Sequence, residues 1–381
     1  MLKYYERKKL KSISKRLLVL SNKLSCGTLA LTPLNYSEEK LKFLHSSTYN
    51  PQFIYHTTSL KKIKDTLQDI EKTVHFAYFP SDVKDYLYEY ITDLKREIRM
   101  QESIGTQEFG SSMAKLFNFD HLDPQAFLSH MQNIPFYEVK DKKLHNAYEI
   151  KAIFDTFISE NNIGHEVVID TFNDHIVRVE KNKVVIGAAV KRFCHNVQRL
   201  LVHEVESHVL QRASMQYTQN PIVRLMKHQD SVLWGEGLAV YNELHSGTIT
   251  RDAFETYYYR LKAVSMINKS FRDIFEFLAN HMKIEKAYLM TYRVKRGMQN
   301  TENPGGNPKD ACYALGYERV REYIEGDGSI ELLYMSRVPH IGELLLNNDL
   351  LEQGSIYLPE YLKKNITKSK HQSLETIHQL Q

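Results

Sequence analysis

The chain has 381 residues, 42% hydrophobic and 25% charged, and a formal net charge of only +4; this is ordinary for a globular protein and gives no indication of nucleic-acid binding. Its three cysteines, Cys26, Cys194 and Cys312, lie far apart in the sequence, which argues against a disulfide framework or a cysteine-based zinc site and fits a reducing compartment. No apolar run approaches the ~18 residues needed to span a membrane, and the start has no cleavage-type signal, so we expect a cytoplasmic protein with no transmembrane segment.

The first predicted element is a basic amphipathic helix. Residues 1–23 carry eight Lys and Arg against one Glu, and apolar residues recur at helical spacing. These apolar residues are Leu10, Ile13, Leu17, Leu20 and Leu24. The segment is either a packed helix with a solvated basic face or a helix that meets an acidic partner or a membrane surface.

Helical periodicity continues to about residue 160, with a start signal at Pro80 and Ser81 and shorter helices over 123–133 and 145–161. The most polar joint is the charged stretch 138–146. We therefore predict a mainly helical N-terminal region, 1–140, followed by a catalytic domain, 141–381.

The periodicity changes between residues 165 and 190. "HEVVID", "HIVRVE" and "KVVIGAAV" are short and rich in β-branched residues, which predicts an antiparallel meander. "KVVIGAAV" is either an edge strand that could pair with a peptide substrate or a buried central strand. Helices are expected again from residue 194, including 230–246, 251–267, 270–282, 284–296 and 309–325. This pattern predicts an α+β fold, mainly helical, with a small antiparallel sheet.

The stretch "LLVHEVESHVLQ" contains His203, Glu204 and His208 in an HExxxH spacing. On a regular α-helix, residues five apart diverge by about 140°, so the two imidazoles could not reach one ion. A π-type bulge would bring them together, and such bulges often occur at functional sites. The motif is therefore either a distorted metal site or a surface helix with polar residues.

A third ligand is available on the next predicted helix, "DSVLWGEGLAVYNELHSG". Asp230 can cap its start and Gly247 can end it. Gly235 and Gly237 would let this helix approach the HEVESH helix closely, so that Glu236 could reach the same ion. The alternative is a core helix with one solvent-facing acid. The nearby Trp234 is better explained by core packing than by a substrate pocket.

Three later cations could hold a carboxylate. Arg293, Arg296 and Lys309 flank the glycine-rich "NPGGNPKD", whose backbone N–H groups could also face an anion. This feature favours a carboxypeptidase over an endopeptidase. Each of the three could equally be an ordinary surface cation.

"HEVESH" followed by "GEGLAVYNE" resembles the tyrosine/phenylalanine carboxypeptidase family with HExxxH and QEGLA-type motifs, which includes the microtubule-associated tubulin tyrosine carboxypeptidases. "YRVKRG" (292–297), "GGNPKDACYALG" (305–316) and "SEEKLKFLHSSTYNPQFIY" (37–55) are similar to other parts of that family. Two residues depart from its pattern: Gly235 replaces a Gln or Glu, and Pro308 replaces a hydroxyl residue.

The resemblance implies a gluzincin-like zinc metallopeptidase with one Zn²⁺ per chain. His203, His208 and Glu236 would bind the ion, and Glu204 would act as the general base while zinc-bound water attacks the peptide. Tyr313 is the first choice of oxyanion donor because it lies in a family-like segment, ahead of Tyr241 and His245.

The expected activity is removal of an aromatic residue, Tyr or Phe, from the C-terminus of a peptide or protein, such as an acidic tail. Another zinc family also uses HExxxH with a downstream glutamate, so a dipeptidyl-peptidase-like exopeptidase is the alternative enzyme. A catalytically silent regulatory scaffold and a metal-free helical interaction protein are alternatives of other classes.

Overall fold

The computed structural model describes residues 2–24, 31–57, 59–119, 122–129, 134–139, 142–171, 177–180, 182–217, 221–350 and 356–363. Cys26 and the polar C-terminal segment after residue 363 lie outside the described residues. The described part is mostly helical with short strands, so the α+β prediction is confirmed at this level. No helix in the described ranges is long and apolar enough to cross a membrane.

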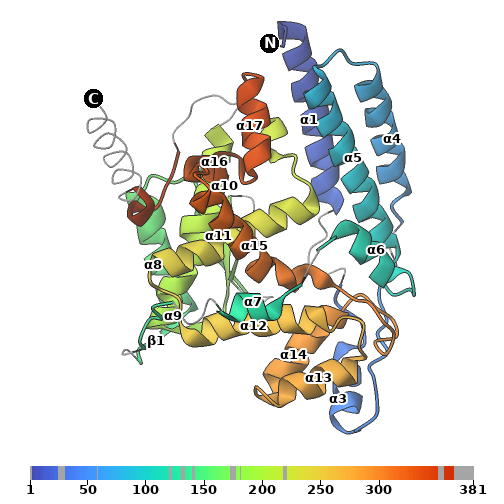
Figure 1. The fold of residues 1–381 in the computed structure, drawn as a ribbon, viewed down its shortest axis with the longest axis vertical. Helices are drawn as coiled ribbons and strands as arrows, with labels where there is room; N and C mark the ends of the chain where they lie inside the picture. The colour runs from blue at the N-terminus through green and yellow to red at the C-terminus, as the bar shows by residue number, and fades with distance from the viewer. Residues whose placement is uncertain are drawn as a thin grey trace.

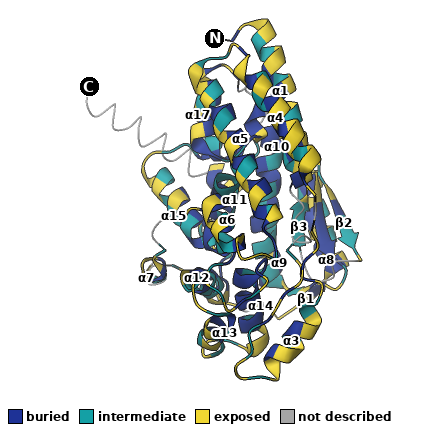
Figure 2. Ribbon diagram, turned by 90° about the vertical axis from the view of Figure 1, so that its right-hand side faces the viewer, coloured by how far each residue is buried: buried dark blue, intermediate teal, exposed yellow. Residues whose placement is uncertain are grey.

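The described residues of the N-terminal region form helices α1 (Tyr4–Leu24), α3 (Tyr36–Leu44), α4 (Lys61–His75), α5 (Ser81–Glu102), α6 (Phe109–Leu116) and α7 (Pro124–Ser129). Helices α1, α4, α5 and α6 pack side by side at one edge of the molecule, whereas α3 and α7 lie apart from this group (Figure 1). Helix α1 packs against α4 and α5 and buries all five of its predicted apolar residues. The basic residues lie on its outer, largely exposed face (Figure 2), so the interpretation as a packed helix is confirmed.

Five short strands form two sheets among the described residues. They are β1 (Leu144–Asn146), β2 (Glu166–Asp170), β3 (Val177–Glu180), β4 (Lys183–Gly187) and β5 (Lys191–Phe193). Strands β1 and β5 pair antiparallel. The other sheet has the order β2-β4-β3, and helix α8 (Ala147–Glu160) packs against β2.

The predicted antiparallel meander is wrong for one of its two pairings. Strand β3 pairs antiparallel with β4, but β2 pairs parallel with β4, with Val167 opposite Val184. Strand β4 is therefore central, and its continuous buried run, Val184–Ile186, is typical of a strand covered on both sides. This excludes β4 as the edge strand for a peptide; among the described strands of this sheet, β2 and β3 are the edges.

The C-terminal half is helical and surrounds the HEVESH segment. Its elements are α9 (Cys194–Leu200), η2 (Leu201–Val209), α10 (Leu210–Tyr217), η3 (Pro221–Arg224), α11 (His228–His245), α12 (Arg251–Ser265), α13 (Phe271–Ala279), α14 (Ile284–Lys295), η4 (Pro308–Ala311), α15 (Cys312–Glu325), α16 (Ile330–Ser336) and α17 (Pro339–Asn347). The helices predicted over 230–325 are confirmed to within a few residues.

The predicted ends of α11 have different outcomes. Gly247 follows the helix with φ of 69°, as expected of a residue that ends it. Asp230 does not cap the start, because α11 begins at His228. The His228 N–H donates instead to Asp93 Oδ2 of α5, at 2.6 Å. A carboxylate distant in sequence thus takes the capping role and ties α11 to the N-terminal helices.

One hydrophobic core cluster includes residues from both predicted regions, from Leu2 to Leu362. Trp234 belongs to it and lies edge-to-face against Tyr323, with ring centroids 5.7 Å apart, so its interpretation as core packing is confirmed. The division into domains near residue 140 stays a prediction.

Candidate metal centre

A π-helix carries the HEVESH residues. Segment η2 has nine residues in this conformation and continues directly from α9 and into α10. Because π-helical hydrogen bonds join residues five apart, His203 and His208 lie on the same face. The Ser207 hydroxyl follows the same spacing and donates to the Val202 carbonyl at 2.8 Å. The predicted distortion is therefore confirmed, and it is longer than a single bulged turn.

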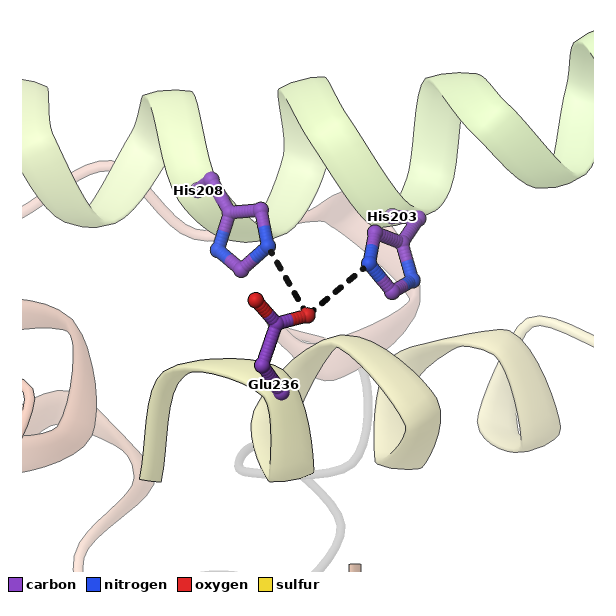
Figure 3. A group of neighbouring side chains, drawn as sticks. All are labelled: His203, His208 and Glu236. Atoms are coloured by element: carbon purple, nitrogen blue, oxygen red, sulfur yellow. Dashed lines mark ion pairs between the residues drawn. The ribbon is translucent and has the colours of Figure 1, made fainter. Parts of the chain in front are cut away.

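His203 and His208 both point toward Glu236 of α11 (Figure 3). Glu236 Oε2 lies 3.4 Å from His203 Nε2 and 3.7 Å from His208 Nε2. One ligand atom from each residue can be chosen so that all lie within 4.8 Å of one another. Since zinc–ligand distances of about 2.0–2.1 Å place tetrahedral ligand atoms about 3.3 Å apart, the spacing fits a zinc ion.

The two glycines beside Glu236 do not serve the approach that the sequence suggested. A Cβ at Gly237 would lie 2.2 Å from the backbone of Gly316, so this glycine permits close packing of α11 on α15 rather than on η2. A Cβ at Gly235 would meet the side chain of Arg337 at 3.5 Å. Successive helical residues point about 100° apart, so the neighbours of Glu236 necessarily face other elements.

A second carboxylate, Glu243, holds His203 from the other side of the ring. Its Oε1 lies 2.7 Å from His203 Nδ1 and also accepts hydrogen bonds from Arg199 Nη1 at 2.8 Å and the Tyr257 hydroxyl at 2.9 Å. A carboxylate on the distal nitrogen fixes the orientation and tautomer of a metal-binding imidazole. Glu243, Arg199 and Tyr257 are not among the site residues predicted from the sequence. Glu243 was detectable, because it follows Glu236 by seven residues and so shares its helix face.

The cluster favours a cation between its carboxylates and imidazoles. Burial acts to lower the pKa of His203, but Glu236 and Glu243 outweigh it and raise this pKa to about 10. Burial lowers the pKa of His208 to about 4. Although burial acts to raise it, the pKa of Glu236 is held well below its ordinary value by the two histidines. An ionised carboxylate beside a neutral His208 is a suitable ligand set for a divalent metal.

A cavity of about 220 Å³ opens beside this cluster. Its lining includes Arg199, His203, Glu204, Tyr257, Arg260 and Tyr313. Burial raises the pKa of Glu204 to about 7, which suits a group that exchanges protons near neutral pH. A larger hollow of about 810 Å³ lies between α5 and α6, but none of the predicted site residues lines it.

Tyr313 is the predicted oxyanion donor that lies in this cavity. Its ring is 6.4 Å from that of His203 and stacks on Tyr257 at 5.3 Å. Tyr241 and His245 instead stack on each other at 3.8 Å, and His245 lines a different hollow, with Tyr317 and Arg321. The structure thus brings Tyr313, and not the other two, to Glu204.

The predicted substrate cations lie outside the lining of the 220 Å³ cavity. Arg293 donates from Nε and Nη2 to the two oxygens of Asp310, at 2.5 and 2.6 Å. Arg296 is 8% exposed, and Lys309 is partly exposed in η4, where Pro308 opens the turn. Two other arginines, Arg199 and Arg260, line the cavity. No sequence motif had marked them.

No curated protein matches the chain significantly. The family model described as microtubule-associated tyrosine carboxypeptidase matches residues 42–379, which include every predicted site residue. Because this match spans most of the sequence, the chain belongs to the microtubule-associated tyrosine carboxypeptidase family.

Proposed function

We propose that the protein is a zinc-dependent carboxypeptidase that removes a C-terminal tyrosine or phenylalanine from a peptide or protein tail. Membership of the family supports a carboxypeptidase that acts on tyrosine-ended tails. The observation that carries the finer proposal is the gathering of His203, His208 and Glu236 next to a cavity that Glu204 and Tyr313 line.

His203, His208 and Glu236 would hold one zinc ion, since their donor types and spacing fit. Bound there, zinc supplies a Lewis acid that polarises a carbonyl and lowers the pKa of water. Glu243 keeps His203 in position through Nδ1, so that Nε2 faces the site.

Glu204 and Tyr313 provide the proton chemistry. The Glu204 carboxylate takes a proton from the attacking water and can return it to the leaving amine. Burial raises the pKa of Tyr313 well above its ordinary range, so its hydroxyl stays protonated and can donate to the oxyanion.

We place the protein in the cytoplasm. No disulfide joins Cys194 and Cys312, the two cysteines that the structure describes, which agrees with a reducing compartment. Its proposed partner is a protein C-terminus such as an acidic tail.

The test uses two peptides with the same acidic sequence, one ending in free tyrosine and one in tyrosine amide. Wild type and Glu204→Gln are incubated with each, and zinc is measured on both proteins. We expect one zinc per chain in both, and tyrosine release only by wild type from the free-acid peptide. Zinc-loaded wild type that releases no tyrosine would contradict the proposal.

The same assay separates the rival enzyme and the silent scaffold. A dipeptidyl peptidase would release a dipeptide from the other end, and blocking the peptide N-terminus would stop it. A scaffold would bind zinc and cleave neither peptide.

A further inference from the structure

Four arginines lie around Tyr313, and they differ in how their guanidinium groups are used. Arg293 binds both oxygens of Asp310. Arg199 donates to Glu243 and to the Tyr257 hydroxyl. Arg296 is buried away from the cavity lining. The fourth, Arg260, lines the cavity together with Glu204.

Arg260 has no protein carboxylate of its own within ion-pair distance in the described structure. Its guanidinium carbon lies 4.6 Å from the centre of the Tyr313 ring, and its Nε is buried without a hydrogen-bond partner. Stacking occupies the face of a guanidinium and leaves the N–H groups at its edge available. A buried donor with no partner carries a desolvation cost that an anionic ligand would remove.

The charge balance around Arg260 also favours an anion. Although burial acts to raise the pKa of Asp310, Arg293 holds it low, and Arg260 and Arg296 add to the effect. Three guanidinium groups therefore act on one carboxylate, whose two oxygens are both taken by Arg293. The cavity lining contains two acids, Glu204 and Asp252. Glu204 is the proposed base, and the Asp252 side chain is 87% exposed and pairs with Lys286 at 3.4 Å.

The position of Arg260 suits the end of a peptide. In a carboxypeptidase substrate, the scissile carbonyl and the terminal carboxylate are separated by one residue, about 3.8 Å of backbone. The carboxylate site must therefore lie close beside the metal-binding residues. The Tyr313 ring centre lies 4.6 Å from the Arg260 guanidinium carbon and 6.4 Å from the centre of the His203 ring, so both groups lie near the same tyrosine.

We propose that Arg260 binds the terminal carboxylate of the substrate and so makes the enzyme require a free C-terminus. Tyr313 sets the plane of the guanidinium, and Arg293 and Arg296 supply positive charge behind it without touching the peptide. This inference rests on the proposed function and assigns its specificity to a residue of α12.

The test measures binding, so that it does not depend on turnover. Zinc-loaded Glu204→Gln protein is titrated with the labelled free-acid and amide peptides, with and without Arg260→Gln. We expect Arg260→Gln to weaken free-acid binding about 10- to 100-fold and to leave amide binding nearly unchanged. Arg260→Lys keeps the charge but loses the planar fork, so it should fall between the two.

Arg251→Gln is the matched control. Arg251 is also a residue of α12, and its guanidinium carbon lies 5.0 Å from the centre of the Phe136 ring. It does not line the cavity. It should leave the acid-over-amide preference intact.

The inference is overturned if folded, zinc-loaded Arg260→Gln keeps the preference, which would assign the carboxylate to another cation such as Lys309 or Arg337. It is also overturned if the parent protein binds both peptides equally. Failure of the proposed function looks different: wild type would cleave neither peptide, while the preference in binding would still depend on Arg260.

Discussion

At the scale of single residues, the site depends on a few atoms that accept several hydrogen bonds at once. Glu243 Oε1 accepts hydrogen bonds from Arg199, His203 and Tyr257 together, and the carboxylate is fully buried. Burial acts to raise the pKa of Glu243, but Arg199 and His203 outweigh it and lower this pKa, so the group stays ionised. The imidazole is thus held by a fixed negative charge.

Glu243→Gln should therefore weaken zinc binding by about 10- to 100-fold, because His203 loses the charge that orients it and raises its basicity. Competition with a chromophoric chelator measures the affinity. Tyr257→Phe, which removes one donor and no charge, is the control and should have a smaller effect. Equal zinc affinity in wild type and Glu243→Gln would contradict the role of Glu243 in orienting His203 for zinc.

Tyr313→Phe tests the oxyanion donor. Loss of one such donor typically lowers kcat by about 100- to 1,000-fold. Zinc content and KM should change little, because the ring and its contacts with Tyr257 and Arg260 remain. Steady-state kinetics on the free-acid peptide give the result, and an unchanged kcat would assign the donor role elsewhere.

At the scale of elements, helix α11 must place Glu236 toward η2 while packing tightly on α15. Gly237 and Gly316 make this possible, because a Cβ added at either position would clash with the backbone of the opposite helix. Replacing a helical glycine by alanine normally stabilises the protein by up to about 1 kcal/mol. At Gly237 the clash with α15 should outweigh this gain, so that the substitution destabilises the protein.

Gly237→Ala should lower the free energy of unfolding by about 1–3 kcal/mol. The new Cβ would meet the backbone of Gly316, and no flexible side chain is there to move aside. Gly235→Ala, two residues earlier on the same helix, meets only the Arg337 side chain at ordinary contact distance and should be neutral or slightly stabilising. Urea unfolding of both variants makes the comparison. Equal effects would mean that the close crossing of α11 and α15 is not as described.

At the scale of the whole molecule, helix α5 carries two buried acids, Glu97 and Asp93, and Asp93 accepts the His228 N–H at the start of α11. Burial raises the pKa of Glu97 to about 7, with Asp93 adding to the shift. The folded protein therefore holds this proton more tightly than the unfolded chain. The resulting stability is fully present below about pH 4.5, the ordinary pKa of the group, and is lost as the pH rises through 7.

Glu97→Gln should consequently be more stable than wild type at pH 8.5, and this advantage should shrink at pH 5. The difference between the two pH values is expected to reach up to about 3 kcal/mol. Urea unfolding at both pH values measures it, with Glu102→Gln, exposed on the same helix, as the control. An advantage of the same size at both pH values would contradict the proposed burial of this charge.

The sequence predicted what depends on local pattern. The helices over 230–325 and the need for a π-distortion at His203 and His208 follow from periodicity and spacing. Asp230 failed as a cap because Asp93, 135 residues before His228, provides the acceptor. The parallel pairing of β2 with β4 is likewise a long-range choice.

The same distinction explains what was missed in the site. Glu236 stands in a recognisable motif, whereas Arg260 gains its importance only when α12 packs beside Tyr313. Arg293 and Arg296 were singled out because they flank a glycine-rich loop. No pattern in the sequence indicates that Arg293 binds Asp310.

The most direct measurement of the central claim is tyrosine release from the free-acid peptide by chelator-treated protein before and after one equivalent of zinc. For wild type we predict no release without zinc and full recovery with it. His208→Ala, which loses one of the three ligands, should release no tyrosine in either condition. Release that persists without zinc, or that His208→Ala retains, would contradict the assignment of this site as a zinc peptidase.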